Sequence, residues 1–199
     1  MSSNDKMIAY LRESVDVTDE EAMLFSSYFK EVRVKKGQYI IQPNFVAKHR
    51  NFVLAGSFRG FVVDDKGNDH TISFAIEGWW ISDVNSYINQ QPATMFVVAM
   101  ENSLIFQIDY ESEQELKRIN HKYETFWRIR GERGMAFLQK RLISNLTHTA
   151  EERYDNFLKL YPSIAERVPQ YAMASFLNMT TQFLSRIRKN KTKSETGLT

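Results

Sequence analysis

Residues 112–148 form a long stretch of the chain that contains neither proline nor an alternation of polar and apolar residues. Glycine occurs in it only as Gly131 and Gly134. Because proline and alternation are the usual signs that a helix has ended, this stretch predicts one long helix. Such a helix beside a small domain has more apolar surface than that domain can cover. The chain is therefore limited to folds in which a second surface packs on the uncovered side of the helix.

The apolar residues of this stretch indicate what the partner is. They recur at intervals of three and four residues along one side of the predicted helix, as in a helix–helix seam. The seam consists of Met135, Leu138, Leu142 and Asn145. A neighbouring stripe consists of Trp127, Gly131, Gly134 and Leu138, two of which are small residues. We expect the helix to pair with its own copy in a two-fold homodimer. The alternative, in which the stripe packs only within the chain, stays open.

The sequence before this helix changes from a helical to an alternating pattern. Residues 5–14 and 18–30 are typical of two short helices, whereas Val32 and Val34 alternate with Arg33 and Lys35. Short strands are predicted within residues 51–76, 95–100 and 103–108, with Gly56 and Gly60 at bends or bulges and a hairpin loop at residues 65–68. Short strands at this spacing predict a small antiparallel barrel or sandwich.

Residues 168–190 are typical of two short helices joined by a tight turn. Ala174 is small enough for a second helix to cross closely, and Asn178 stands where a left-handed residue is needed. Thr180 can cap the next helix, whose inward residues are Leu184 and Ile187. This is the arrangement in which a helix-turn-helix presents its second helix to the major groove of DNA.

The outward residues of the second helix have the chemistry for contacts with double-stranded DNA. Gln182 can offer a paired donor and acceptor to adenine, and Arg186 two parallel donors to guanine. The DNA-binding candidates are Thr180, Thr181, Gln182, Ser185, Arg186, Arg188 and Lys189. The threonines, Arg188 and Lys189 suit phosphate contacts. An amphipathic helix with a solvated basic face is the alternative that these residues alone leave open.

Composition excludes several classes of function. The chain has no cysteine, which removes disulfides, thiolate metal sites and cysteine nucleophiles. Its four histidines are scattered, so no metal site is expected. The charged N-terminus is unlike a signal peptide and no long apolar run occurs, so we expect a cytoplasmic protein without a membrane partner. The net charge is only +2, but positive charge is concentrated after residue 185.

The order of these parts resembles the Crp/Fnr-type transcription regulators over nearly the whole chain. The most specific stretches are Glu152-Arg153-Tyr154, Phe157-Leu158, Pro162, Val168-Pro169-Gln170 and Leu184-Ser185-Arg186-Ile187-Arg188. The resemblance implies an α+β fold with an antiparallel jelly-roll barrel of the cyclic-nucleotide-binding type over residues 1–111, a dimerisation helix over 112–148 and a helix-turn-helix domain over 149–199. It also implies DNA and RNA polymerase as partners, and Thr181, Gln182 and Arg186 as base readers.

Two departures from the family pattern change the expected function. Family members that bind cyclic AMP hold its phosphate with an arginine, but the matching segment here has Ser82-Asp83 and Ala93-Thr94 at the two key pairs. Without that charge a buried phosphate loses its strongest partner, so we expect that cyclic AMP is not the effector. The usual C-terminal wing also has no counterpart in residues 190–199, a polar segment expected to be flexible without DNA.

Three further readings concern the barrel. One is an apolar pocket for an unidentified effector, lined by Trp80, Asp83, Thr94, Phe96 and Trp127. Ordinary core packing explains the aromatic residues among them as well. A cupin-type enzyme needs paired histidines that are missing around His70, so we expect neither an enzyme nor a cofactor. A barrel that serves as a small-molecule sensor or a protein-interaction scaffold without specific DNA binding remains the alternative function.

Overall fold

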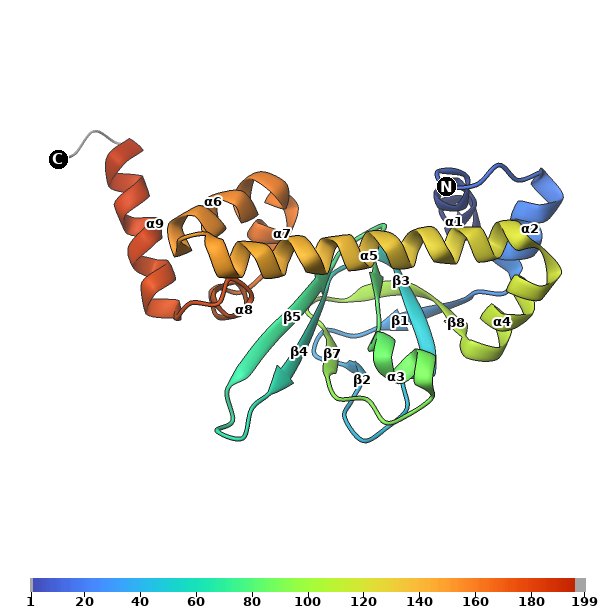
Figure 1. The fold of residues 1–199 in the computed structure, drawn as a ribbon, viewed down its shortest axis with the longest axis horizontal. Helices are drawn as coiled ribbons and strands as arrows, with labels where there is room; N and C mark the ends of the chain where they lie inside the picture. The colour runs from blue at the N-terminus through green and yellow to red at the C-terminus, as the bar shows by residue number, and fades with distance from the viewer. Residues whose placement is uncertain (1, 196–199) are drawn as a thin grey trace.

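The computed structural model describes residues 2–195, with side chains described for residues 2–191. A β-barrel lies below one long helix, two short helices lie near the N-terminus, and a group of helices lies at the other end of the long helix (Figure 1). The helices are α1 (Ser3–Arg12), α2 (Asp19–Ser27), α3 (Val84–Asn89), α4 (Tyr110–Ile119), α5 (His121–Thr147), α6 (Ala150–Leu160), α7 (Pro162–Arg167), α8 (Gln170–Phe176) and α9 (Thr181–Glu195). Helix α9 continues through Glu195, so residues 190–195 are helical and not the flexible segment expected; residues 196–199 of that expectation lie outside the described part.

The barrel consists of two four-stranded antiparallel sheets. Its strands are β1 (Lys30–Val34), β2 (Tyr39–Ile41), β3 (His49–Ala55), β4 (Phe58–Val63), β5 (Asp69–Ala75), β6 (Trp80–Ile81), β7 (Phe96–Ala99) and β8 (Ser103–Asp109). One sheet has the order β1-β8-β3-β6 and the other the order β2-β7-β4-β5. Apolar side chains that alternate along the strands meet between the sheets, among them Val53, Phe58 and Ile105. The predicted α+β fold with an N-terminal antiparallel barrel is confirmed.

Two glycines of the barrel have the backbone geometry that the sequence predicted. The register of β4 and β5 shifts between Gly60 and Phe61, which is the bulge predicted there. Gly56 has a φ of 99°, and a Cβ atom at this position would lie 2.1 Å from the hydroxyl oxygen of Ser103. Both the left-handed backbone and the close approach therefore require glycine between β3 and β4.

The prediction of one unbroken helix over residues 112–148 is wrong. Helix α4 ends at Ile119 and α5 begins at His121, because Asn120 has an extended backbone with φ −150° and ψ 123°. The Asn120 side chain accepts a hydrogen bond from the amide of Lys122 at 3.0 Å and donates one to Glu21 at 2.8 Å. Asn120 thus caps α5 and ties it to α2, which turns the chain between the two helices.

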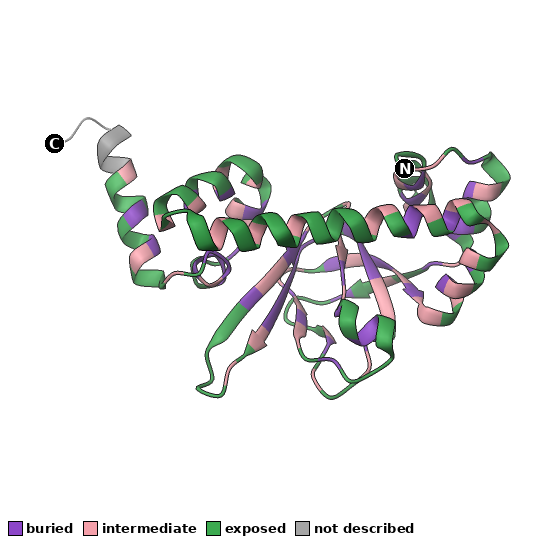
Figure 2. Ribbon diagram, viewed as in Figure 1, coloured by how far each residue is buried: buried purple, intermediate pink, exposed green. Residues whose placement is uncertain are grey.

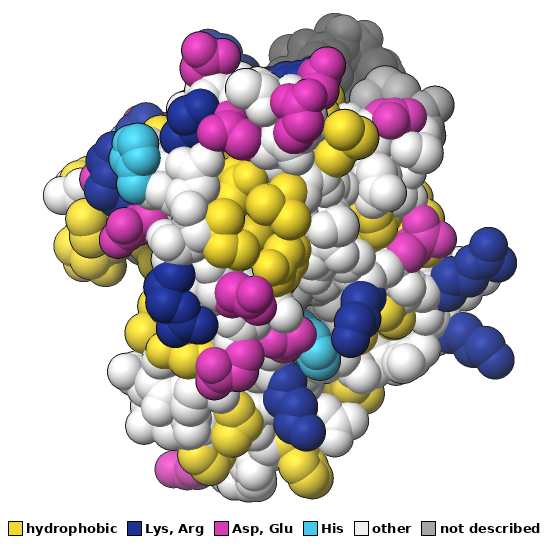
Figure 3. Space-filling model, turned by 90° about the vertical axis from the view of Figure 1, so that its right-hand side faces the viewer, with side chains coloured by type: hydrophobic (Ala, Val, Ile, Leu, Met, Phe, Trp, Pro, Cys, Tyr) yellow, Lys and Arg dark blue, Asp and Glu magenta, His cyan; other side chains and the backbone are white. Residues whose placement is uncertain are grey.

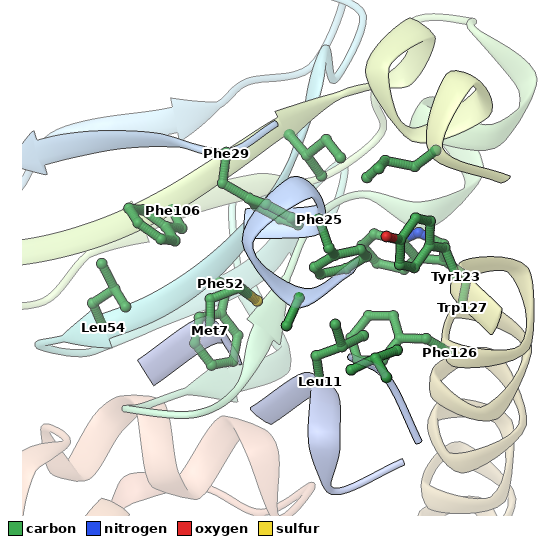
Figure 4. Close-up of a cluster of buried hydrophobic side chains, with 14 residues drawn as sticks. Met7, Leu11, Phe25, Phe29, Phe52, Leu54, Phe106, Tyr123, Phe126 and Trp127 are labelled. Carbon is green, nitrogen blue, oxygen red and sulfur yellow. The ribbon is translucent and has the colours of Figure 1, made fainter. Parts of the chain in front are cut away.

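A cluster of aromatic side chains fixes the first half of α5 to the barrel and to the N-terminal helices (Figure 4). Phe126 and Phe25 meet edge to face with centroids 5.2 Å apart, and both are fully buried. Trp127 meets Trp80 of β6 in the same way at 5.0 Å. Since aromatic pairs of this kind add to the gain from burial, α1, α2, α5 and one sheet form a single packed unit.

The second half of α5 leaves an apolar face uncovered in the monomer (Figure 2). The exposed side chains recur along one side of the helix, and each is more than half exposed: Met135, Leu138, Leu142 and Leu146. Gly131 and Gly134 have open space where a Cβ atom would stand. Trp127 of the predicted stripe is buried within the chain, so packing within the chain accounts for that end of the stripe but not for these exposed residues.

The C-terminal helices are held against the barrel through β5. The Ser175 hydroxyl accepts a hydrogen bond from the Thr71 amide at 2.8 Å and donates one to the Asp69 carbonyl at 2.9 Å. Phe74 of β5 packs on Phe176 with ring centroids 5.3 Å apart. Arg167 of α7 pairs with both Glu77 and Glu101, at 2.7 and 2.6 Å. These contacts fix where α8 stands, and through α8 they position α9.

Candidate nucleic-acid interface

The turn between α8 and α9 is closed by backbone hydrogen bonds around a left-handed residue. Asn178 has a φ of 54°, as predicted. The Asn178 amide donates to the Ser175 carbonyl at 3.1 Å, and the Met179 amide donates to the Ala174 carbonyl at 3.0 Å. This pair of bonds is the Schellman motif, which satisfies carbonyls at the end of α8 and sends the chain into a new direction.

Arg153 of α6 supports the same turn from outside. Its Nε donates to the Leu177 carbonyl at 2.9 Å, and its guanidinium also donates to the His148 carbonyl at 2.7 Å. One side chain therefore links the end of α5, the start of α6 and the turn of the helix-turn-helix. From the sequence, Arg153 was identified only as part of a family motif. Its supporting role could not be predicted, because its hydrogen-bond partners are backbone carbonyls, which no pattern of side chains indicates.

Helix α9 is divided into a buried and an exposed side. Leu184 and Ile187 are buried against Met173 and its neighbours in α8, which confirms the inward residues predicted from the sequence. The Thr180 hydroxyl accepts a hydrogen bond from the Phe183 amide at 3.1 Å, so Thr180 caps α9. Seven candidates are exposed on the remaining surface of the turn and helix: Thr180, Thr181, Gln182, Ser185, Arg186, Arg188 and Lys189. The structure brings all of them to one side.

One contact within α9 restrains the side chain of Arg186, a candidate base reader. The Arg186 guanidinium lies 4.6 Å from the centroid of the Phe183 ring, which is a cation–π contact. Phe183 is half-buried, so it gives the flexible arginine a fixed support on the helix surface. Farther along, Lys191 is paired with Asp155 of α6. The arrangement offers a planar cation and an amide at successive turns of one exposed helix face, which suits base edges in a major groove.

The opposite end of the molecule has a different surface. Viewed from the end where α2 and α4 lie, acidic, basic and hydrophobic side chains are interspersed (Figure 3). Acidic residues occupy the first turn of α2 at Asp19, Glu20 and Glu21. A polyanion would find both charge signs on that face, so α9 is the better candidate for contact with DNA.

The structure separates the five residues expected to line an effector pocket into three places. Trp80 and Trp127 belong to the aromatic cluster under α5. Phe96 of β7 stacks on Phe61 of the neighbouring strand β4 at 5.1 Å. Asp83 caps α3 and accepts a hydrogen bond from the Thr94 amide at 2.9 Å. Two pairs are therefore brought together, Trp80 with Trp127 and Asp83 with Thr94, and Ala93 beside Thr94 is buried in the barrel core.

A buried charge cluster that the sequence did not predict lies beside α3. The fully buried carboxylate of Glu113 in α4 accepts hydrogen bonds from Arg50 of β3 at 2.6 Å, from Lys117 at 2.6 Å and from the Tyr87 hydroxyl of α3 at 2.9 Å. Burial and the neighbouring carboxylate raise the pKa of Tyr87, so its hydroxyl stays protonated and donates. These residues come from three separate elements, and for this reason no local motif marks them.

No group of three histidine, aspartate or glutamate side chains is placed to hold a metal ion in residues 2–191. No helix within the described part is both long and apolar enough to cross a membrane.

Comparison with known proteins identifies the barrel and the arrangement of the whole chain. Residues 31–120 match the family described as the cyclic nucleotide-binding domain. FixK2 from Bradyrhizobium japonicum is similar in structure, with a TM-score of 0.73 and 15% identity over 85% of this chain and 86% of FixK2. The c-di-GMP responsive global regulator CLP from Xanthomonas campestris has a TM-score of 0.69 and 13% identity over 89% of this chain and 93% of CLP. No curated protein matches the sequence.

A third similar structure is described as a regulator of the Crp/Fnr family from Eubacterium rectale, with a TM-score of 0.68 and 14% identity over 88% of this chain and 83% of that one. Residues 31–120 are therefore similar to cyclic nucleotide-binding domains. Barrel, long helix and C-terminal helices together have the fold of the Crp/Fnr-type transcription regulators, which confirms the resemblance seen in the sequence.

Proposed function

We propose that the chain is a dimeric, sequence-specific DNA-binding transcription regulator of the Crp/Fnr type. The exposed face of α9 carries this proposal: Gln182, Ser185 and Arg186 are exposed together while Leu184 and Ile187 hold the helix to α8. Regulator neighbours with the same fold support it. Residues 1–111, 112–148 and 149–199 are the proposed effector, dimerisation and DNA-binding regions, acting in the cytoplasm.

Each exposed residue has a proposed role. Gln182 and Arg186 read base edges, because an amide pairs with adenine and a guanidinium with guanine. Thr181 and Ser185 contact either a base or a phosphate. Thr180, Arg188 and Lys189 hold phosphates, which fixes register and gives salt dependence without sequence information. If the protein activates transcription, we propose RNA polymerase as its further partner.

The readers can be tested separately from the phosphate contacts. The probe is a duplex selected by the wild-type protein from a random library, and affinity is measured by fluorescence anisotropy. We expect Arg186→Ala to weaken binding by about ten- to a hundredfold and to relax the preference at one base position, since a bidentate base contact is worth about 1–3 kcal/mol. Lys189→Ala should weaken binding to all duplexes alike and make the salt dependence of the affinity less steep.

The scaffold alternative makes the opposite prediction. A barrel used only for protein contacts would select no sequence, and Arg186→Ala would bind the duplex as the wild type does. Exposed Lys159 on α6 supplies the control: Lys159→Ala removes the same charge without touching α9 and should leave affinity and preference unchanged.

We further propose that cyclic AMP does not control the protein. Where an arginine would have to meet the phosphate, Ala93 is buried among apolar side chains, and the Asp83 carboxylate beside it is held by the Thr94 amide. Without that arginine a buried phosphate has no cationic partner here and loses its strongest interaction. Titration calorimetry with millimolar cyclic AMP should give no saturating heat; binding in the micromolar range would overturn this proposal.

A further inference from the structure

A groove lies where the dimer helix α5 meets the DNA-binding helices. It has a volume of about 130 Å³ and is formed by residues of α5, α6 and the end of α8. Its apolar surface consists largely of aromatic rings: Phe157 lies 5.5 Å from Phe176 and 5.7 Å from Tyr161, centroid to centroid. Leu160 is 65% exposed at the rim, so the groove opens to solvent. An apolar cavity of similar size can hold a benzene-sized molecule.

The charges around the groove have one sign. Among its described lining residues three are cationic, Lys140, Arg141 and Arg153, and none is acidic. Arg141 donates to the carbonyls of Ile72, Thr71 and Phe176, which are neutral partners. Its Nε is buried without a hydrogen-bond partner among the described residues. Burial lowers the pKa of Arg141 and no carboxylate opposes that effect. Positive charge in a half-buried site without a counterion favours an anion.

The groove differs from the proposed dimer face. Successive helical residues are about 100° apart, so Phe137, Arg141 and Ser144 lie roughly 110° around α5 from the seam at Leu138 and Leu142. Asn145 lies between the two and belongs to both, so a partner helix on the seam borders the groove at Asn145 and leaves its Phe137 and Arg141 side open. The groove also touches both the helix that would pair the protomers and the turn that positions α9, through Arg153 and Leu177.

From the apolar floor, the cationic rim and the missing acids we infer that this groove binds a small amphipathic organic anion, a carboxylate with a hydrocarbon or aromatic body. The apolar body lies against Phe157, Phe176 and Tyr161. The carboxylate lies near Lys140 and the Arg141 Nε. A ligand held there contacts α5, α6 and α8 at once, so it biases the angle between the dimer helix and the recognition helix. This effector role rests on the proposed DNA-binding function, whereas binding itself does not.

The test uses the full-length protein and octanoate, with 1-octanol as the uncharged probe of equal length. Titration calorimetry should show one octanoate per protomer and at least tenfold weaker binding of 1-octanol. Lys140→Glu should weaken octanoate about three- to tenfold, since a partly exposed charge contributes modestly. Lys159→Glu, the same reversal on α6 outside the groove, should not. Asn156→Trp, which fills the groove from its exposed rim, should abolish binding.

Several outcomes would overturn the inference. Three of them concern binding: no saturable binding of octanoate, equal affinity for octanoate and 1-octanol, or unchanged octanoate binding by Asn156→Trp. The fourth concerns access: an Asn156→Cys variant whose thiol is protected from a cysteine-directed label in the dimer would show that the groove is covered. Circular dichroism of the Asn156→Trp variant confirms that it folds. Because none of these measurements includes DNA, failure here leaves the DNA-binding proposal standing. Failure of DNA binding likewise leaves the ligand site standing.

Discussion

Replacing Leu138 and Leu142 of α5 together by glutamate should convert the protein from a dimer to a monomer and weaken its binding to a two-half-site duplex by about a thousandfold. Both leucines are more than half exposed in the monomer. Burial of such a side chain stabilises the dimer by about 1.5–3 kcal/mol. In a two-fold dimer each substitution occurs in both protomers, so this stabilisation is lost twice. The glutamates would also place like charges opposite one another.

The loss of DNA binding follows from geometry. A helix-turn-helix dimer holds two recognition helices about one turn of DNA apart, so a monomer keeps the contacts of one half-site only. Analytical ultracentrifugation gives the mass, and fluorescence anisotropy gives the affinity. Ala136→Glu is the matched control, because Ala136 is exposed on α5 roughly a quarter of a turn or more from the seam. A wild-type monomer, or a double variant that stays dimeric, would refute the proposed seam.

The elements that the sequence predicted well are those specified by their own neighbours. Alternating residues such as Val32 and Val34 mark a strand because every second side chain faces the barrel. Asn178 and Thr180 mark the turn and the cap because each acts on backbone within a few residues. Local physics is enough in these cases, and the helix-turn-helix could be located to within a few residues.

What the sequence did not predict depends on partners far along the chain. Asn120 interrupts the long helix with support from Glu21, which is 99 residues away. Ser175 on α8 holds β5 across more than a hundred residues. The residues expected to line an effector pocket are separated for the same reason: Trp80 and Phe96 are both apolar barrel residues, but they lie in different sheets. Residue type alone does not tell these sheets apart.

The Glu113 cluster is a non-local constraint on the barrel, because it joins α4, the helix that leads into α5, to β3 and to α3. Glu113→Ala should lower the free energy of unfolding by about 3 kcal/mol. The carboxylate is fully buried, and its removal leaves Arg50, Lys117 and the Tyr87 hydroxyl without their common acceptor. The two cations are about one-quarter exposed or less, so solvent compensates only in part.

Urea unfolding, with all variants at one protein concentration because dimerisation adds to stability, measures the effect. Glu113→Gln keeps the size of the side chain and one acceptor oxygen. It should therefore lower the free energy of unfolding by less, about 1–2 kcal/mol. Glu111→Gln on the exposed side of α4 is the control and should change stability by less than about 0.5 kcal/mol. If Glu113→Ala were as stable as Glu111→Gln, the cluster would be a solvated surface pair and α3 would be held by the Asp83 cap and core packing alone. A loss restricted to Glu113 would show that this cluster stabilises the contact between α3 and α4, the helix that leads into α5.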